Sequence, residues 1–326
     1  MQDGFGRRIE YLRISVTDKC NLRCVYCMPE QGLPWLARSE ILTYEEIAQV
    51  VRVMAEMGLR RVRLTGGEPL VRRDLPVLAR LLAEVPGIDD LALSTNAVLL
   101  RRFAAPLRDA GVGRLNISLD SLRPERVDAI ARRPGSFAAI MDGLDAAVEA
   151  GFTPIKINTV VMRGRNDDEI ADFARLTRER PWHVRFIEVM PVGDNLGVSS
   201  NEFVSAFEIL SRLRSVGGLE PVAGPAGNGP AEYFRFPGAA GTVGVITPMS
   251  HNYCDRCNRM RLTASGQLRP CLFGDIETDL REPLRRGDSL EPLIRHTLTI
   301  KPERHQLVRG SAAGSGGLRA LSQVGG

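Results

Sequence analysis

Apolar residues recur along this chain in two alternating patterns: short runs that predict strands, and stripes at helical spacing that predict helices. The predicted strands occupy residues 11–16, 61–64, 91–94, 115–119, 155–161 and 184–189. The predicted helices run from Thr43 to a stop at Gly58, and over residues 75–84, 99–110, 137–150 and 166–177. Strands that alternate with helices in this way indicate a parallel sheet built from β/α units.

Two of the helix starts carry side chains that can satisfy free backbone N–H groups. Thr43 with Glu46 fits a capping box, and Asn166 with Glu169 has the same spacing. Both pairs therefore predict where a helix begins.

The placement of polar motifs favours one architecture within the α/β class. Polar residues such as Glu68, Asn96 and Asp120 come directly after predicted strands. Functional residues gather at that end of the strands in β/α barrels. A full or partial β/α barrel therefore fits better than a doubly wound sheet, and we assign residues 1–216 to this core.

The amino-acid composition of the chain changes near residue 217, where Gly, Pro and Ala become frequent. The expected elements are a loop at 217–229, a hairpin of 233–236 and 242–246, two helical stretches between 276 and 298, and a flexible tail at 310–326. We assign residues 217–326 to a smaller α+β domain.

The composition is that of a globular protein, with 44% hydrophobic and 25% charged residues. A net charge of +4 is too small to indicate binding to duplex nucleic acid, but it leaves room for an anionic small molecule. No run reaches the ~18 apolar residues that a membrane span needs, and the first residues lack an apolar signal segment. We therefore expect a cytoplasmic protein that binds neither nucleic acid nor membrane.

Three of the six cysteines, Cys20, Cys24 and Cys27, lie in one short loop after the first predicted strand. So short a loop cannot pair them in unstrained disulfides, and a cytoplasmic chain is not expected to form disulfides. Soft thiolate ligands at this spacing indicate an iron–sulfur cluster or zinc. No His lies near this loop, which favours a cluster, and three ligands leave one coordination position open.

The other three cysteines are Cys254, Cys257 and Cys271, which again form an incomplete ligand set. His251 could complete a zinc site here, and that alternative stays open. A second cluster with an open iron is favoured, because the first trio already implies iron–sulfur assembly. Arg259 and Arg261 would then flank this cluster on alternate positions of a strand.

The sequence Gly66-Gly67-Glu68-Pro69 ends the second predicted strand. Two glycines let backbone approach a ligand closely, and a carboxylate can accept hydrogen bonds from an ammonium group. An ordinary turn between a strand and a helix explains the same residues equally well.

Five cations fall within predicted strands, namely Arg13, Arg61, Arg63, Lys156 and Arg185. Arg61 and Arg63 share one face of their strand, and Thr65 continues that face. If these side chains point into a barrel, they form a basic interior suited to a polyphosphate. A solvated outer face, or ion pairs with Asp and Glu, is the alternative explanation.

In combination these motifs resemble the radical S-adenosylmethionine (radical SAM) superfamily, and within it the GTP 3′,8-cyclase family of molybdenum cofactor biosynthesis. The resemblance rests on the cysteine loop, the basic strands, the second trio with Arg259-Met260-Arg261, and the terminal Gly325-Gly326. It covers essentially the whole chain. It implies an incomplete, TIM-like (β/α)6 barrel closed by a C-terminal α+β domain that carries a second cluster.

The resemblance also assigns roles to individual residues. It implies that one [4Fe–4S] cluster is held by Cys20, Cys24 and Cys27, and another by Cys254, Cys257 and Cys271. It implies S-adenosylmethionine (SAM) contacts at Tyr26, Gly66, Gly67, Glu68, Ser118 and Met190. It implies GTP contacts at Arg13, Arg61, Arg63, Thr95, Lys156, Arg185, Arg259, Met260 and Arg261. Catalytic roles fall on Arg259, Arg261, Gly325 and Gly326. One departure is Ala97, where the family usually has glycine.

The implied reaction converts GTP to (8S)-3′,8-cyclo-7,8-dihydroguanosine 5′-triphosphate, so the enzyme is a lyase. A 5′-deoxyadenosyl radical from SAM removes the hydrogen at C3′ of GTP, and the C3′ radical adds to C8. The resemblance further implies a homodimer, an external reductant, and a downstream cyclic pyranopterin monophosphate synthase. It also implies that the C-terminal glycines reach into the active site.

Two other classes of function stay open on the residues alone. A radical enzyme that modifies peptides also has an auxiliary-cluster domain, although such domains usually carry more than three cysteines. A non-catalytic protein that binds zinc or nucleic acid would hold zinc without labile sulfide. Anaerobic analysis of iron, zinc and sulfide separates these classes.

Overall fold

The computed structural model describes residues 1–190, 192, 198–227, 229–305 and 319–325. Its strands are β1 (Tyr11–Ser15), β2 (Arg61–Thr65), β3 (Asp90–Thr95), β4 (Arg114–Ser118), β5 (Ile155–Val161), β6 (His183–Glu188), β7 (Glu220–Val222), β8 (Glu232–Arg235), β9 (Thr242–Ile246), β10 (Arg259–Leu262), β11 (Gln267–Arg269) and β12 (Thr278–Asp279). Its α-helices are α1 (Tyr44–Glu56), α2 (Leu75–Ala83), α3 (Leu100–Asp109), α4 (Pro124–Ala131), α5 (Ser136–Glu149), α6 (Ile170–Glu179), α7 (Ala206–Arg214), α8 (Arg281–Arg286), α9 (Glu291–Thr299) and α10 (Leu321–Val324).

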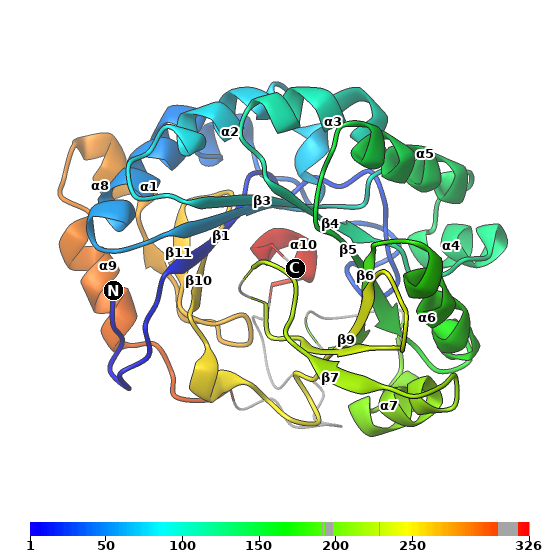
Figure 1. Ribbon diagram of the computed structural model, residues 1–326. Helices are drawn as coiled ribbons and strands as arrows, with labels where there is room; N and C mark the ends of the chain where they lie inside the picture. Colours follow the sequence, from blue (N-terminus) through cyan, green and yellow to red (C-terminus); the bar gives the residue numbers. More distant parts are fainter. Residues whose placement is uncertain (191, 193–197, 228, 306–318, 326) are drawn as a thin grey trace.

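The strands form one curved sheet in the order β12-β11-β10-β1-β2-β3-β4-β5-β6-β9-β8-β7. Strands β1 to β6 lie side by side in chain order, and each neighbouring pair is parallel. The helices that connect them cover the outside of the curve (Figure 1). The predicted parallel sheet of β/α units is therefore confirmed as a TIM-like partial barrel.

The C-terminal region extends this sheet at both edges. Strand β9 pairs in parallel with β6, and β10 pairs in parallel with β1. The predicted hairpin is confirmed as β8 and β9, which pair antiparallel. Strands on both sides of residue 216 thus belong to one sheet, and the division of the chain at that residue stays a prediction.

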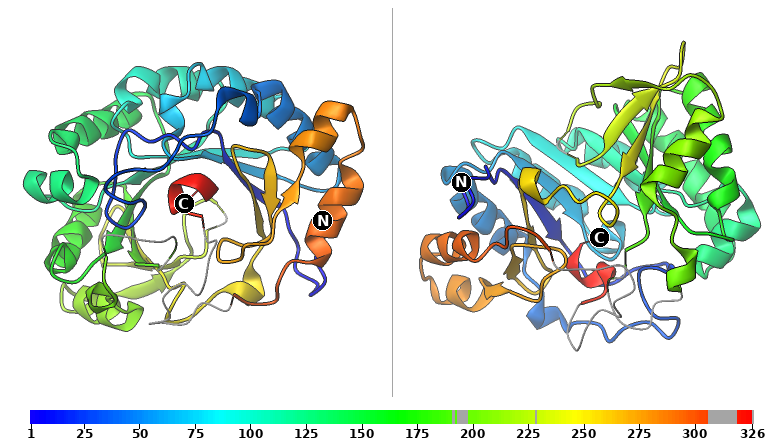
Figure 2. Two further views of the ribbon diagram at one scale, coloured as in Figure 1. Left: turned by 180° about the vertical axis from the view of Figure 1, so that it is seen from behind. Right: turned by 90° about the horizontal axis from the view of Figure 1, so that it is seen from below.

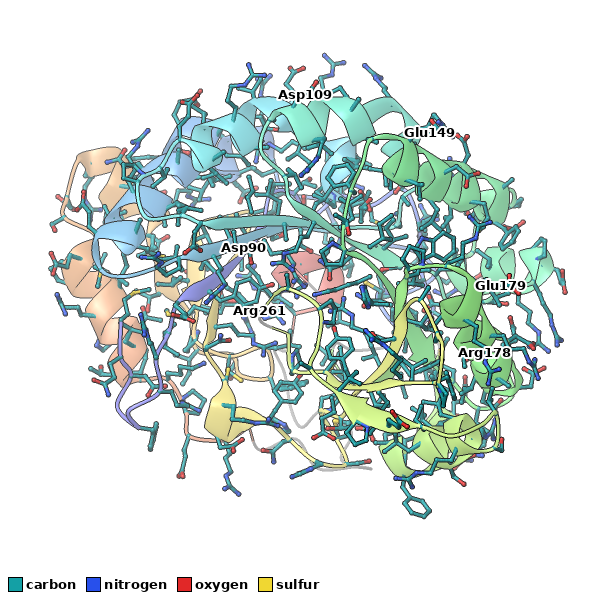
Figure 3. The ribbon with its side chains drawn as sticks, viewed as in Figure 1. Asp90, Asp109, Glu149, Arg178, Glu179 and Arg261 are labelled. Carbon is teal, nitrogen blue, oxygen red and sulfur yellow. The ribbon has the colours of Figure 1, made fainter. Side chains whose placement is uncertain are left out.

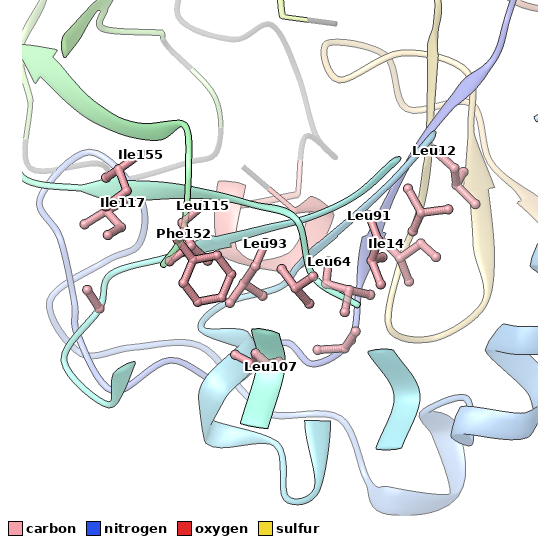
Figure 4. Packing of buried hydrophobic residues seen from close by; sticks show 14 of the residues in the cluster. Leu12, Ile14, Leu64, Leu91, Leu93, Leu107, Leu115, Ile117, Phe152 and Ile155 are labelled. Carbon is pink, nitrogen blue, oxygen red and sulfur yellow. The ribbon is translucent and has the colours of Figure 1, made fainter. Parts of the chain in front are cut away.

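Alternation along the strands decides which side chains face the helices and which face the barrel interior. Leu12 and Ile14 of β1 and Leu64 of β2 are buried in the main hydrophobic core. Figure 4 shows these residues along the sheet, in the same cluster as Leu107 of α3. Arg13, between Leu12 and Ile14, takes the opposite face. The outer face is thus apolar, which leaves the inner face for polar and charged residues.

The predicted start of α1 is confirmed in detail. The Thr43 hydroxyl accepts a hydrogen bond from the Glu46 N–H at 3.1 Å, and the Glu46 carboxylate accepts from the Thr43 N–H at 2.7 Å. Helical structure also begins after Asn166, with a 3-10 turn over Asp167–Glu169 that leads into α6, but the capping bonds expected of Asn166 and Glu169 are absent. The Asn166 amide donates to the Asp120 and Val160 carbonyls instead, and Glu169 accepts from Ser121. Tertiary contacts compete successfully for these two side chains.

Two further expectations need correction. Helix α4 was not predicted, and β7 lies inside the predicted loop at 217–229. Of the predicted flexible tail, residues 310–318 and Gly326 lie outside the described residues, but Leu321–Val324 forms α10. Figures 1 and 2 show this helix in red inside the ring of strands. The end of the described chain thus occupies the barrel interior.

Candidate active site

The inner face of the barrel surrounds a cavity whose walls come from β1 to β6, from β10 and from α10. The predicted site residues that line it are Arg13, Cys20, Cys24, Tyr26, Cys27, Arg63, Gly66, Gly67, Glu68, Thr95, Ser118, Arg185, Met190, Arg259 and Arg261. These residues are up to 248 positions apart in the chain, from Arg13 to Arg261. The parallel sheet brings them together because the corresponding ends of its strands meet at one edge.

Helix α4 fixes the loop of the first trio, although the sequence analysis missed this helix. The N–H groups of Arg23 and Val25 donate to the Ala131 and Ile130 carbonyls, each at 3.0 Å. These carbonyls belong to the last turn of α4, where the helix leaves them free. Pro124 at the helix start and the apolar spacing from Val127 were the signals that could have revealed it.

The half-buried cysteines of the first trio lie among neutral and acidic groups. Burial raises the pKa of Cys20 and of Cys27 to about 12, and it also raises that of Cys24. The neighbouring carboxyls of Glu68 and Asp120 add to the increase. Thiolates are stable here only beside added positive charge, which a bound iron–sulfur cluster supplies.

The first trio therefore fits a cluster. Neither trio forms a set of three His, Cys, Asp or Glu side chains that could hold a single metal ion, over the ranges that the structure describes.

Gly66 and Gly67 hold the second strand end against the cysteine loop. A Cβ on Gly66 would lie 2.6 Å from the Thr17 carbonyl oxygen, and one on Gly67 would lie 2.3 Å from that of Lys19. The Gly67 N–H donates to the Thr17 carbonyl at 2.8 Å. The close approach that requires glycine is thus to the protein's own loop, whereas the sequence suggested approach to a ligand.

Glu68 organises the polar turn at this edge. Its carboxylate accepts hydrogen bonds from the Thr95 hydroxyl and the Asn96 N–H, both at 2.7 Å, and from the Leu70 N–H at 3.0 Å. Burial raises the pKa of Glu68 to about 7 despite these bonds. The carboxylate faces the cavity and gains stability as an anion when a cation binds beside it.

Tyr26 lines the cavity, and its hydroxyl donates to Asp120 at 2.8 Å. Burial raises the pKa of Asp120 to about 6. The sequence analysis placed Asp120 at a strand end but gave it no role. Its contact with Tyr26 now identifies it as a residue that orients the cysteine loop.

Four arginines on the cavity wall have no carboxylate partner among the described residues. Arg63 stacks on Tyr11 and Arg259 on Tyr253, with guanidinium-to-ring distances of 5.4 and 5.3 Å. Arg185 donates to the Asn158 and Asn116 amides at 2.8 and 2.6 Å, and Arg261 donates to backbone carbonyls of the C-terminal segment. Figure 3 shows Arg261 directed into the interior, whereas Glu149 and Arg178 lie on outer helices. Such uncompensated cations favour an anionic ligand.

Three other residues assigned to GTP do not line this cavity. Arg61 forms an ion pair with Glu10 at the start of β2, roughly 13 Å of strand before Thr65 at ~3.3 Å per residue. Met260 alternates with Arg259 and Arg261, so its side chain packs in the hydrophobic core. Lys156 donates to the Ala226 carbonyl at 2.6 Å.

Lys156 nevertheless belongs to the basic interior. Burial, with the positive charges of Arg185, Arg114 and Arg63, lowers its pKa to about 6. A lysine with so low a pKa gains a full charge when an anion binds near it.

The second trio lines a smaller cavity that adjoins the first. Cys254, Cys257 and Cys271 all face it. The residues that line both cavities are Tyr253, Arg259, Arg261 and Leu272. The two trios therefore line adjoining cavities, and the two arginines belong to the wall that these cavities share. His251, the alternative zinc ligand, does not line this cavity, whereas His305 does.

The C-terminal segment contacts the substrate arginines predicted from sequence. The Gly325 carbonyl accepts hydrogen bonds from Arg261 and, at 3.2 Å, from Arg13. Gly325 has φ +73°, and a Cβ there would lie 2.7 Å from the Thr65 side chain. Only glycine fits both the backbone conformation and the space.

Comparison with known proteins agrees with this geometry. Residues 14–177 match the radical SAM superfamily, and residues 182–307 match the molybdenum cofactor synthesis C family. A GTP 3′,8-cyclase from Pelotomaculum thermopropionicum is 50% identical over 330 aligned positions, which span 100% of both chains. A GTP 3′,8-cyclase from Moorella thermoacetica is 49% identical over 100% of both chains. The chain belongs to the GTP 3′,8-cyclase family of the radical SAM superfamily.

The fold agrees with membership of this family. The structure of Streptococcus suis SuiB bound to S-adenosylmethionine superimposes with a TM-score of 0.64, over 94% of this chain and 78% of that one. At 14% identity this likeness concerns the fold alone. Membership of the radical SAM superfamily implies one [4Fe–4S] cluster and SAM. In the described part of the chain, no helix is long and apolar enough to cross a membrane.

Proposed function

We propose that this chain is a radical SAM GTP 3′,8-cyclase, which makes (8S)-3′,8-cyclo-7,8-dihydroguanosine 5′-triphosphate in the first step of molybdenum cofactor biosynthesis. One observation carries the proposal: the two cysteine trios open onto adjoining cavities that share Arg259 and Arg261. In the described ranges these two arginines, like Arg63 and Arg185 on the wall of the larger cavity, have no carboxylate partner. Adjoining cavities with two soft ligand sets and a basic wall suit a redox group, a cofactor and a polyphosphate substrate.

The first trio and its neighbours would hold the cofactor. Cys20, Cys24 and Cys27 would bind one [4Fe–4S] cluster, and the Gly66-Gly67-Glu68 turn would hold SAM beside it. Bound there, cluster and SAM together supply a 5′-deoxyadenosyl radical. Tyr26, Ser118 and Met190, which line the same end of the cavity, would shape the SAM site.

The basic wall and the second trio would hold GTP. Arg13, Arg63, Lys156 and Arg185 would bind the triphosphate, and Thr95 would contact the nucleotide. Cys254, Cys257 and Cys271 would hold a second [4Fe–4S] cluster in the adjoining cavity. Arg259 and Arg261 line both cavities and would orient the ribose toward the radical source. With substrate bound, the barrel walls would limit the access of water to the reacting atoms.

Several parts of the proposal extend beyond this chain. We propose that the chain acts as a homodimer, receives electrons from an external reductant, and passes its product to a cyclic pyranopterin monophosphate synthase. We place this system in the cytoplasm.

The deciding experiment is anaerobic incubation of the reconstituted chain with dithionite, SAM and GTP. Formation of 5′-deoxyadenosine should depend on GTP, and GTP deuterated at C3′ should transfer deuterium to it. Omission of GTP and replacement of GTP by ATP are the controls. The proposal fails if 5′-deoxyadenosine forms equally without GTP, or if no deuterium is transferred.

A further inference from the structure

Lys301 is a buried lysine close to the second trio, and the proposed reaction gives it no role. It follows α9, which packs against β11 and β12 (Figure 1). Only 3% of the residue is exposed. A lysine is almost never buried to this extent without partners that offset the loss of water.

The ammonium group of Lys301 contacts three acceptors. Its Nζ lies 3.5 Å from the Cys257 Sγ, 3.1 Å from the Arg259 carbonyl oxygen and 2.5 Å from the Pro270 carbonyl oxygen. These contacts use the three protons of the ammonium. No carboxylate is paired with Lys301 in the described ranges, so its positive charge is directed at the sulfur and the two backbone dipoles.

The three acceptors lie on the segments that present the second trio and its arginines. Cys257 comes shortly before β10, Arg259 begins β10, and Pro270 directly precedes Cys271. One side chain thus joins two ligand-bearing segments and the arginine strand. Groups held in this way from outside the ligand set commonly fix ligand orientation and tune a metal centre.

The charge also acts on the ligand itself. The Lys301 ammonium lies 3.5 Å from the Cys257 Sγ, so its positive charge stabilises negative charge on that sulfur.

We propose that Lys301 is a positioning residue that holds the second trio in place and raises the reduction potential of the cluster bound there. The inference rests on the proposed function to the extent that this trio holds an iron–sulfur cluster. A positive charge and an N–H···S contact both stabilise the reduced, more negative form of such a cluster.

Lys301→Met tests the charge while keeping much of the side-chain length. We expect the second cluster to become harder to reduce, with an about tenfold change in its oxidised-to-reduced ratio, or ~59 mV for a one-electron couple. The measurement is an anaerobic redox titration of the full chain followed by electron paramagnetic resonance. The triple variant Cys20→Ala/Cys24→Ala/Cys27→Ala identifies which signal belongs to the second cluster.

Two control variants separate this contact from general effects. Arg295→Met removes one positive charge from an exposed position on α9, and it should leave the potential unchanged. Asp3→Asn/Arg7→Met removes a local ion pair without changing net charge. Arg7 donates to the Cys254 carbonyl at 2.8 Å and to the Pro302 carbonyl at 2.7 Å. Both of these acceptors are backbone oxygens, whereas Lys301 also contacts a ligand sulfur. This double variant should loosen the same region with a much smaller change in potential.

The outcomes are distinct. An unchanged potential in Lys301→Met with unchanged iron content overturns the inference, as does an equal change in Arg295→Met. If Lys301→Met keeps its fold and first cluster but loses the second, the positioning role is supported. If Lys301→Met does not fold, Lys301→Gln is titrated instead, and an unchanged potential there overturns the inference. Absence of iron and labile sulfide from the second trio of the wild type refutes that part of the proposed function before any variant is made.

Discussion

The two cysteine trios present the same three soft ligands, yet the chain surrounds them with different charges. The charged groups beside the first trio are the carboxyls of Glu68 and Asp120, and the pKa of each of its thiols is raised. In the second trio burial raises the pKa of Cys254, but at Cys257 the nearby Lys301 and Arg259 outweigh burial and lower the pKa. Since nearby cations favour reduction, we expect the first cluster to have the lower reduction potential.

This difference suits a division of labour. A centre that passes an electron to a bound cofactor works best at low potential, whereas one that anchors a substrate works best if it does not compete for that electron. Arg259 and Arg261 line both cavities and so connect the two environments. Substitutions around each trio can test this division, from the largest expected effect to the smallest.

Removal of one ligand from each trio should have two different results. Cys24→Ala should abolish 5′-deoxyadenosine formation, because the cofactor loses its site. Cys257→Ala should retain slow SAM cleavage but form no cyclic product, because the substrate loses its anchor. Chromatography of both products under reducing conditions measures this. Equal loss of SAM cleavage in both variants would contradict the proposed division.

The C-terminal glycine should be needed for cyclisation and not for cluster binding. Gly325→Ala should lower the rate of cyclisation about a hundredfold, as expected for a displacement of about 1 Å in the active site. Gly238→Ala is a matched control, because Gly238 has φ +72° against +73° for Gly325, but a Cβ on Gly238 would have no atom within 4 Å. Rates are compared at equal iron content.

Deletion of Gly325 and Gly326 should likewise abolish cyclisation and leave both clusters in place. Full activity of that truncated chain would show that the tail has no part in the reaction. Loss of either cluster would instead show that the tail has a structural role.

Binding of GTP should be accompanied by proton uptake at Lys156. The pKa of Lys156 is about 6 in the free protein, so its amine is mostly neutral at pH 7. A triphosphate raises that pKa, and GTP affinity should therefore fall as pH rises above about 6. Calorimetry in buffers of different ionisation enthalpy measures the protons taken up.

Two substitutions at Lys156 complete this test. Lys156→Arg should bind GTP without the proton uptake, because arginine stays charged. Lys156→Met should raise KM for GTP about 10–100-fold, because a hydrogen bond to a charged group contributes about 1.5–3 kcal/mol. Proton uptake that persists in Lys156→Arg would assign it to another group.

The smallest effect is expected at Ala97, on the side of the first trio. Ala97 has φ +62°, a conformation that costs a residue with a Cβ about 1 kcal/mol more than glycine. Ala97→Gly should raise the midpoint of thermal unfolding by about 1–2 °C. This net value allows for the greater conformational entropy that glycine gives the unfolded chain, which partly offsets the relief of strain. The neighbouring Asn96 side chain donates a hydrogen bond to Asn21 at 2.8 Å, which joins this turn to the cysteine loop. We therefore expect the cysteine loop to stay at least as ordered in Ala97→Gly. A lower midpoint would show that the turn is not strained.

Residue spacing was sufficient to predict the parallel β/α sheet, the capping of α1 and the two cysteine trios, because these depend on neighbours in the chain. The basic interior was also foreseen, since charges at alternate strand positions must share a face. Arg61 and Met260 show the limit of that argument. Spacing does not say how far along a strand the cavity extends or which face of β10 lines it.

Tertiary structure decided the features that depend on distant segments. The last turn of α4 fixes the cysteine loop, two strands of the C-terminal region join opposite edges of the sheet, and α10 lies inside the barrel. Lys301 reaches Cys257 across 44 positions of sequence. The sequence by itself determined which ligands and charges the site contains. Folding determined the charge that each trio experiences, because electrostatic interactions act through space and depend on burial.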